Sequence, residues 1–115
     1  MNLQIFGTRK CQDTKKAERF FRERGVTFQL IDLAEKGMSA GELRSVAAAV
    51  GRDALVDTGG RRFKDRGLAY QDYDPESEIM ADPLLLKTPV VRDGNRATVG
   101  YDPVTWEAWI KESSG

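Results

Sequence analysis

Hydrophobic and polar residues follow two kinds of periodicity in the first third of the chain. Residues 3–6 are mostly apolar and precede Gly7, a pattern typical of a short strand that ends in a loop. Residues 12–24 lack glycine and proline, and their apolar side chains recur at helical spacing until Gly25. Residues 26–30 alternate between apolar and polar side chains before Ile31 and Asp32, which predicts a second strand. The predicted order is strand, helix, strand.

The middle of the chain has a helical pattern. Ser39 followed by Glu42 forms a capping-box signal, and apolar residues then mark one helical face as far as Gly51. Beyond that glycine the pattern over 52–82 predicts only short elements. These short helices are expected over residues 54–56, 61–66 and 76–81, with a further helix start at Asp82-Pro83.

The last part of the chain carries a hairpin signal and a final helix. Asp93-Gly94 separates two strand-like segments over 89–99, because this dipeptide tolerates the positive φ angles of tight turns. Asp102-Pro103 places an N-cap and a first-turn proline before an amphipathic helix. Its Trp106 and Trp109 are interpreted as core and rim packing rather than as a ligand box. With no repeat or linker, residues 1–115 are predicted to form one domain.

The amino-acid composition excludes several kinds of catalytic and metal-binding site. The 115 residues, 40% of them hydrophobic, suffice for one core. The absence of histidine excludes imidazole-based catalysis and histidine-ligated zinc, and no metal site is predicted. The single cysteine, Cys11, excludes an internal disulfide and a dithiol cycle within the chain, which favours a reducing compartment.

Charge and hydropathy exclude further classes. The 18 basic residues are balanced by 18 acidic ones and the pI is near 6.3, which argues against direct nucleic-acid binding. No segment approaches the roughly 18 apolar residues of a membrane span, and the N-terminus lacks a signal-peptide pattern. A cytoplasmic protein without membrane attachment is predicted.

Cys11 is the candidate nucleophile. It lies between a strand end and a helix start, where backbone N–H groups are unpaired and the helix dipole presents positive charge. Arg9, Lys10, Lys15 and Lys16 add cations, and such surroundings favour the thiolate form of a cysteine. Spacing alone leaves the alternative of an inert, buried cysteine open.

Two other features have both a functional and a structural interpretation. Pro89 precedes a strand, where a cis proline would form one wall of a site, but cis bonds are only about 5–6% of X–Pro bonds and the base rate favours trans. The basic residues Arg61, Arg62, Lys64 and Arg66 offer charges for an oxyanion, although such clusters are more often solvated.

Three segments together resemble the ArsC/Spx/YffB family of arsenate reductase-like proteins. They are Phe6-Gly7-Thr8-Arg9-Lys10-Cys11, Asp13-Thr14-Lys15-Lys16-Ala17 and Leu86-Lys87-Thr88-Pro89-Val90-Val91-Arg92-Asp93-Gly94. Val99-Gly100-Tyr101-Asp102 is similar to the family's segment before the last helix. The likeness covers nearly the whole chain, and the order and spacing of the segments are more specific than any one of them.

The resemblance implies an α/β fold of the thioredoxin-like type: a βαβ…ββα order, a mixed four-stranded sheet and a helical insertion over roughly 38–86. In the family a cysteine at the Cys11 position attacks arsenate and a second thiol resolves the adduct. Because this chain has no second cysteine, the resemblance implies an external thiol such as glutathione, with glutaredoxin as reductant and no bound cofactor. Spx-like members act through RNA polymerase and typically carry Cys-x-x-Cys, where this chain has Thr14.

The chain departs from the arsenate reductases at one position. They usually place an arginine immediately before the proline that here is Pro89, and this chain has Thr88. Arg92 lies on a strand and Arg96 across the hairpin turn, so neither obviously substitutes, whereas Arg61 or Arg62 could reach the site if the helical insertion folds over it. Arg61 and Arg92 are the candidate charge partners of the site. Thr88-Pro89 instead resembles the residue pair found at this position in thioredoxin- and glutaredoxin-like proteins. In those proteins the backbone beside the proline receives a peptide or glutathione.

The resulting hypothesis is an ArsC-like thiol oxidoreductase, with glutathione-dependent arsenate reduction as its specific form and Cys11 as the nucleophile. The alternative is a non-catalytic, Spx-like interaction protein that binds a protein partner. The predicted substrate- or anion-binding residues are Thr8, Arg9, Gln12, Asp13, Thr14, Arg61, Thr88, Pro89 and Arg92.

Overall fold

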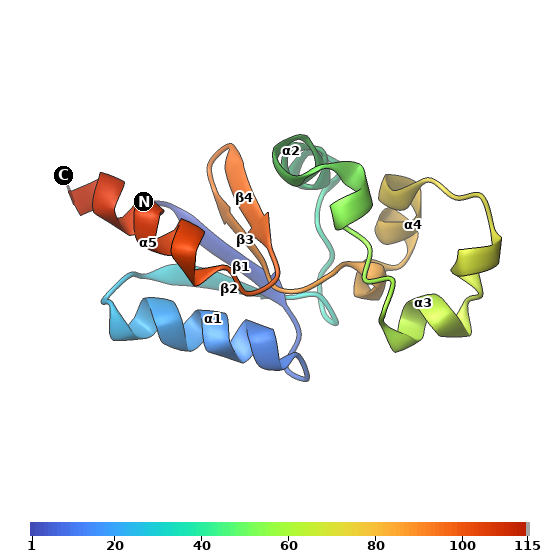
Figure 1. The fold of residues 1–115 in the computed structure, drawn as a ribbon, viewed down its shortest axis with the longest axis horizontal. Helices are drawn as coiled ribbons and strands as arrows, with labels where there is room; N and C mark the ends of the chain where they lie inside the picture. Colours follow the sequence, from blue (N-terminus) through green and yellow to red (C-terminus); the bar gives the residue numbers. More distant parts are fainter. Residues whose placement is uncertain (115) are drawn as a thin grey trace.

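The computed structural model describes residues 1–114, which form four strands and five α-helices (Figure 1). None of the described helices is long and apolar enough to span a membrane. The strands are β1 (Leu3–Gly7), β2 (Phe28–Asp32), β3 (Val90–Asp93) and β4 (Arg96–Val99). The helices are α1 (Gln12–Glu23), α2 (Ala40–Val50), α3 (Arg61–Asp65), α4 (Pro75–Ala81) and α5 (Pro103–Ser114), with short 3₁₀ turns η1 (Arg52–Ala54), η2 (Leu68–Tyr70) and η3 (Pro83–Leu85).

The four strands make one mixed sheet in the order β2-β1-β3-β4. β1 is parallel to β2 and antiparallel to β3, so that Ile5 lies between Leu30 and Val91. β3 and β4 are antiparallel and joined by a two-residue turn at Gly94 and Asn95, one position after the predicted Asp93-Gly94, because Asp93 still pairs with Arg96; Gly94 has a φ of 61°. The predicted mixed four-stranded sheet is confirmed.

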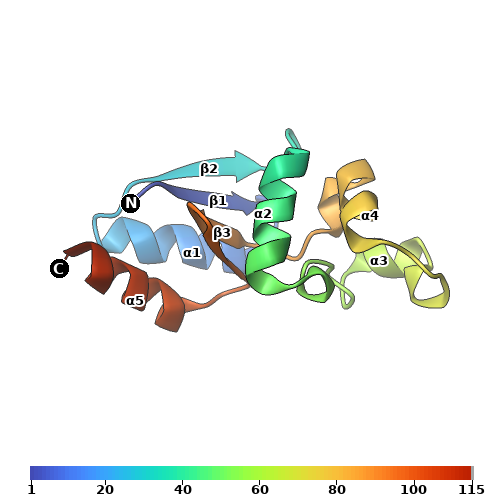
Figure 2. The ribbon, with the colours of Figure 1, turned by 90° about the horizontal axis from the view of Figure 1, so that it is seen from above.

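Each face of the sheet packs against different helices, as Figures 1 and 2 show. Because successive side chains of a strand point to opposite faces, Ile5 and Val91 face α1 and α5, whereas Phe6 and Val90 face α2. The hydrophobic cluster around Ile5 and Val91 also contains Leu3, Ala17, Phe20, Phe21, Trp106 and Trp109. The hydrophobic cluster around Phe6 and Val90 continues from α2 into the shorter helices. It includes Leu43, Val46, Leu55, Phe63, Leu68, Ile79 and Leu85.

Trp106 and Trp109 both pack in the core, where the sequence predicted core and rim packing. Trp106 is completely buried and Trp109 is 5% exposed. The indole Nε1 of Trp106 donates a hydrogen bond of 2.8 Å to the Thr98 hydroxyl, which satisfies the one polar atom that the ring brings into the core. This bond ties α5 to β4.

α2 packs on the sheet, whereas the helices that follow it, here called the distal helices (α3, η2, α4 and η3), extend away from the sheet along the molecule's longest dimension of 47 Å (Figure 2). The capping box at Ser39 and Glu42 is present at the start of α2, as predicted. The helix expected over 54–56 is wrong: η1 ends at Ala54, and Val56 instead forms an isolated bridge with Leu86. That bridge holds the two ends of the distal helices together, a long-range contact that local periodicity does not record.

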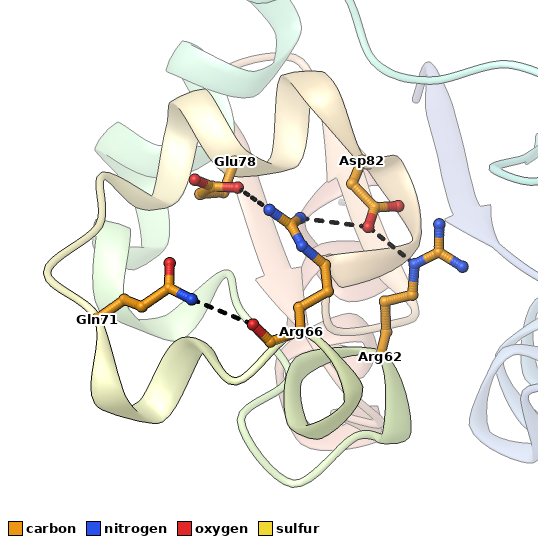
Figure 3. Close-up of polar contacts among 5 residues, drawn as sticks. All are labelled: Arg62, Arg66, Gln71, Glu78 and Asp82. Carbon is orange, nitrogen blue, oxygen red and sulfur yellow. Dashed lines mark hydrogen bonds and ion pairs between the residues drawn. The ribbon is translucent and has the colours of Figure 1, made fainter.

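The basic turn predicted over 61–66 is α3, and two of its arginines have specific partners (Figure 3). Arg62 Nε donates to Asp82 at 2.8 Å, while Arg66 donates to Glu78 at 2.5 Å and to Asp82 at 3.3 Å. The Asp82 side chain is only 12% exposed. These bonds fasten α3 to α4 and η3, so Arg62 and Arg66 stabilise the distal helices.

The ion-paired cluster predicts an acid-sensitive contribution to stability. The hydrogen bond from Arg62, supported by its charge and by Arg66, lowers the pKa of Asp82 below its ordinary value. A carboxyl with a lowered folded-state pKa stabilises the fold above its unfolded pKa and loses that contribution as the pH falls through the folded value. Asp82→Asn is expected to lower Tm by about 4 °C at neutral pH. The difference should shrink as the pH falls below about 4.

Asp72→Asn is the matched control, because Asp72 is exposed and has no ion pair within residues 1–114. Thermal unfolding of both variants and the parent protein across this pH range measures the effect. Equal Tm losses for the two variants at neutral pH would show that net charge, rather than the Arg62 and Arg66 contacts, is responsible.

Candidate functional site

Cys11 lies at the N-cap of α1, in the turn that follows β1. Its backbone N–H donates to the Thr8 carbonyl at 3.2 Å, and its own carbonyl accepts from Lys15 at 3.3 Å. These two bonds fix the residue between the strand and the helix. The thiol is half-buried, so it is held in place and still accessible from solvent.

The start of α1 has unused hydrogen-bond donors beside the thiol. The Cys11 side chain does not cap the helix, and within residues 1–114 no partner accepts from the backbone N–H groups of Gln12, Asp13 or Thr14. Free N–H groups and the helix dipole together favour an anion at this end of a helix. The arrangement can stabilise a thiolate at Cys11 or an anionic group bound next to it.

The loop before β3 forms the other side of the site. The Cys11 thiol donates to the Thr88 carbonyl across 3.7 Å, joining residues that are 77 positions apart. The Thr88–Pro89 peptide bond is cis, so the trans form that base rates favour is wrong here. The Pro89 carbonyl accepts from Gly100 N–H at 2.8 Å, which holds the loop against the chain that leads to α5.

The predicted cations around Cys11 divide into two groups. Arg9 reaches towards Asp32 at 3.7 Å and Glu35 at 4.0 Å. Lys16 pairs with Asp13 at 3.9 Å and lies over the Tyr101 ring. Lys10 and Lys15 are exposed and have no ion pair within the described part of the chain. The electropositive surroundings therefore depend on the helix start and these two lysines.

The structure does not bring either of the two candidate charge partners to Cys11. Arg92 lies on the sheet face opposite α1, where its Nη1 donates to Gln4 Oε1 at 2.9 Å. Strand alternation decides this, because Val91 faces α1 and its neighbour must face away. Arg61 is exposed on α3 and pairs with Asp65 at 3.8 Å, and both views place α3 away from the start of α1 (Figures 1 and 2).

Sequence reasoning missed a close contact between Gly7 and Thr14 underneath the site. Thr14 is 2% exposed, and a Cβ added to Gly7 would lie 2.9 Å from Thr14 Cβ and nearer still to its Oγ1 and Cγ2. α1 can approach β1 this closely only because residue 7 has no side chain. The glycine at the strand end was the available signal.

The mixed sheet, the thiol at the start of α1 and the cis proline beside it define a thioredoxin-like protein. A glutaredoxin from Archaeoglobus fulgidus shares the fold, with a TM-score of 0.51 and 15% identity over 96% of this chain and 86% of that one. The chain belongs to the ArsC family, whose model matches residues 6–109. The thioredoxin-like fold with helices between its halves is confirmed.

Relatives extend over nearly the whole chain. The uncharacterised protein YusI of Bacillus subtilis is 30% identical, covering 88% of this chain and 92% of its own. Global transcriptional regulator Spx 2 of Oceanobacillus iheyensis is 26% identical, covering 88% and 78%. The YFFB protein structure matches with a TM-score of 0.81 and 25% identity over 93% and 97%. An arsenate reductase from Vibrio cholerae matches with 0.77 and 22% over 91% and 94%, which shows the shared fold.

Proposed function

We propose that the protein is a thiol oxidoreductase that uses Cys11 as its single nucleophile and glutathione as the second thiol. The observation that carries the proposal is the half-buried thiol at the uncapped start of α1, 3.7 Å from the Thr88 carbonyl. A thiolate at this position is accessible, faces unpaired donors and lies beside a backbone segment that can receive an extended substrate.

The reaction proposed is exchange with a glutathione mixed disulfide. The Cys11 thiolate attacks the glutathione sulfur, the substrate sulfur leaves as a thiolate, and a Cys11–glutathione disulfide forms. A glutathione thiolate then attacks the glutathione sulfur of this adduct, which releases oxidised glutathione and restores the Cys11 thiolate. One reduced glutathione is consumed in each turnover: its sulfur and the glutathione sulfur of the mixed disulfide leave together as oxidised glutathione, and the substrate thiol is released. An external thiol is required because Cys11 is the only cysteine.

Backbone groups supply most of the binding in this proposal. The N–H groups of Gln12, Asp13 and Thr14 stabilise the thiolate of Cys11 or of the leaving group. The Thr8 carbonyl positions Cys11 through its backbone N–H. Thr88 and Pro89 form the opposite wall, with Pro89 buried and Thr88 half-buried.

Family membership makes arsenate the second substrate to consider. Arsenate carries more charge than a disulfide, and its reduction requires donors that stabilise a developing oxyanion. Residue 88 is threonine, Arg92 donates to Gln4, and Arg61 lies on α3. Without a guanidinium at Cys11, we expect arsenate to react more slowly than a glutathione mixed disulfide.

Intact-mass analysis tests the proposed chemistry. After incubation with oxidised glutathione, the folded protein is expected to gain one glutathione at Cys11 and to lose it when reduced glutathione is added. The adduct should form at least about tenfold faster than on the urea-unfolded protein, because only the folded chain places the thiol at the start of α1. Equal rates, or no adduct in the folded state, would contradict the proposal.

The similarity to Spx 2 favours a second candidate, a protein that binds a partner without catalysis. Its surface would include exposed Arg61 and Lys64 on α3 and Tyr70, which is 94% exposed. RNA polymerase is the partner to test, given the resemblance to Spx-like proteins. Binding of purified polymerase that depends on Arg61 and Lys64 and does not depend on Cys11 would favour this candidate.

A further inference from the structure

A cleft lies between α1 and β2, beside the loop that leads from β1 to Cys11. This α1–β2 cleft has a volume of about 240 Å³, and its walls come from the β1–α1 loop, α1, β2 and the turn after β2. Its lining includes Arg9, Thr14, Glu18, Leu30, Asp32 and Glu35. Cys11 is not among the lining residues, but the cleft adjoins the thiol site, because Thr8, Arg9 and Thr14 line it as well.

Acidic side chains dominate the cleft. Glu18, Asp32 and Glu35 bring three carboxylates, against the single guanidinium of Arg9. The side chains of Glu18 and Asp32 are only 21% and 19% exposed. Glu18 also pairs with Arg22 at 3.7 Å, outside the cleft lining. The Glu35 side chain is 73% exposed and lies at the open side of the cleft. Several carboxylates that line one cleft, two of them with little exposure, favour a bound cation.

Arg9 is the cation that contacts the carboxylates of the cleft, and its contacts with them are weak. Its side chain is 86% exposed, and its contacts with Asp32 and Glu35 are 3.7 and 4.0 Å long, beyond hydrogen-bonding distance. Exposed ion pairs of this length contribute little stability, because solvent screens them and the long side chain must be ordered. A cation from solution can therefore compete with Arg9 for the same carboxylates.

Thr14, one of the residues that line the cleft, has an unused polar atom. Thr14 is 2% exposed, and its Oγ1 has no hydrogen-bond partner among residues 1–114. A buried hydroxyl without a partner costs free energy that a ligand's donor can recover. Leu30 adds an apolar surface, since it is 46% exposed at the same cleft. The cleft thus combines carboxylates, a buried acceptor and an aliphatic wall.

We propose that the α1–β2 cleft binds the primary ammonium group of an alkyl amine. The ammonium displaces Arg9 and donates to the carboxylates of Asp32 and Glu35 and to the Thr14 hydroxyl, while the methylene chain packs on Leu30. Such a group has two sources, a free diamine or the side chain of a lysine in a peptide. The inference does not depend on the proposed reaction of Cys11.

Methyl NMR provides the test, with the resonances of Thr14 and Leu30 as reporters. Titration with 1,4-diaminobutane is expected to shift both resonances saturably, whereas 1,4-butanediol, of the same length without charge, should not. Asp32→Asn with Glu35→Gln should weaken binding about tenfold. The amide oxygen introduced by Asp32→Asn can still accept the bond from Ala34 N–H that the Asp32 carboxylate accepts now, so the local turn is kept.

Removal of Arg9 gives the sharpest outcome. Arg9→Ala is expected to tighten diamine binding about threefold, because it removes the competing cation. Arg61→Ala is the matched control: it removes the same charge from an exposed arginine paired with one carboxylate on α3, and should leave binding unchanged. An equal effect of both variants, or shifts that never saturate, would overturn the proposal.

A lysine-containing tripeptide with blocked ends distinguishes the two sources. Tighter binding of the tripeptide than of 1,4-diaminobutane identifies a protein lysine as the ligand, and the reverse order identifies a free amine. Thr14→Val keeps the shape of the side chain and removes the hydroxyl, so it should weaken both ligands. If neither ligand produces a saturable shift, the cleft does not bind an alkyl ammonium.

Discussion

Cys11→Ser is expected to abolish the exchange of glutathione mixed disulfides, with a loss of about 1,000-fold or more. A serine hydroxyl stays protonated at neutral pH and does not form a disulfide. The substitution preserves the size of the side chain and a donor for the Thr88 carbonyl, so the fold should be maintained. Turnover with a glutathionylated peptide measures the effect, and thermal unfolding checks that Tm is unchanged.

A second variant tests whether the position of the thiol matters. Ala48 is exposed on α2, so Ala48→Cys in the Cys11→Ser protein restores one accessible thiol away from the start of α1. This protein is expected to remain inactive, because the relocated thiol lacks the unpaired N–H groups and the Thr88 wall. Recovery of turnover would show that any exposed cysteine suffices, and would contradict a built site at Cys11.

Gly7→Ala is expected to destabilise the protein by about 3 kcal/mol. The added methyl group would lie 2.9 Å from Thr14 Cβ and closer to the rest of that side chain, so α1 must move away from β1. Because β1 and α1 flank the turn that holds Cys11, the same movement should slow mixed-disulfide formation. Urea unfolding measures the stability change, and the rate of adduct formation measures the change at the thiol.

Thr14→Ala should partly rescue Gly7→Ala, because it removes Oγ1 and Cγ2 and leaves Cβ in place. A double-mutant cycle then reports a favourable coupling between the two substitutions. Gly41→Ala is the matched control: no atom lies within 4 Å of the added Cβ, and alanine favours the helical conformation of α2. That substitution should stabilise the protein by about 0.5–1 kcal/mol. A destabilisation of similar size at both glycines would contradict the packing explanation.

Local signals predicted the elements that depend on neighbouring residues. The capping box at Ser39 and the proline start of α5 appear where the sequence predicts them, and the hairpin turn lies one residue after the predicted Asp93-Gly94, since each is stabilised within a few residues. The segment over 54–56 could not be predicted in the same way. Val56 pairs with Leu86, thirty positions away, and a long-range contact of this kind outweighs weak helical periodicity.

Part of the candidate site could also be predicted from local signals, and part of it could not. Position in the sequence placed Cys11 at a strand end and helix start, and the structure has the residue at the N-cap of α1. Which charged groups lie near Cys11 depends on the direction in which each arginine side chain points, and the spacing of residues along the sequence does not give that direction. Arg92 faces the sheet side opposite α1 because strand neighbours alternate, and Arg9 reaches towards Asp32 and Glu35 after the chain has turned.

The sequence by itself therefore determined the order of elements, the single thiol and its place at a helix start, because these depend on local hydrogen bonding and periodicity. Only the tertiary structure decided which groups surround that thiol. The Thr88 carbonyl reaches Cys11 across 77 positions, Thr14 packs on Gly7, and the carboxylates of Glu18, Asp32 and Glu35 gather around one cleft. These contacts arise when helices pack on a sheet and join distant segments, and no local pattern encodes that packing.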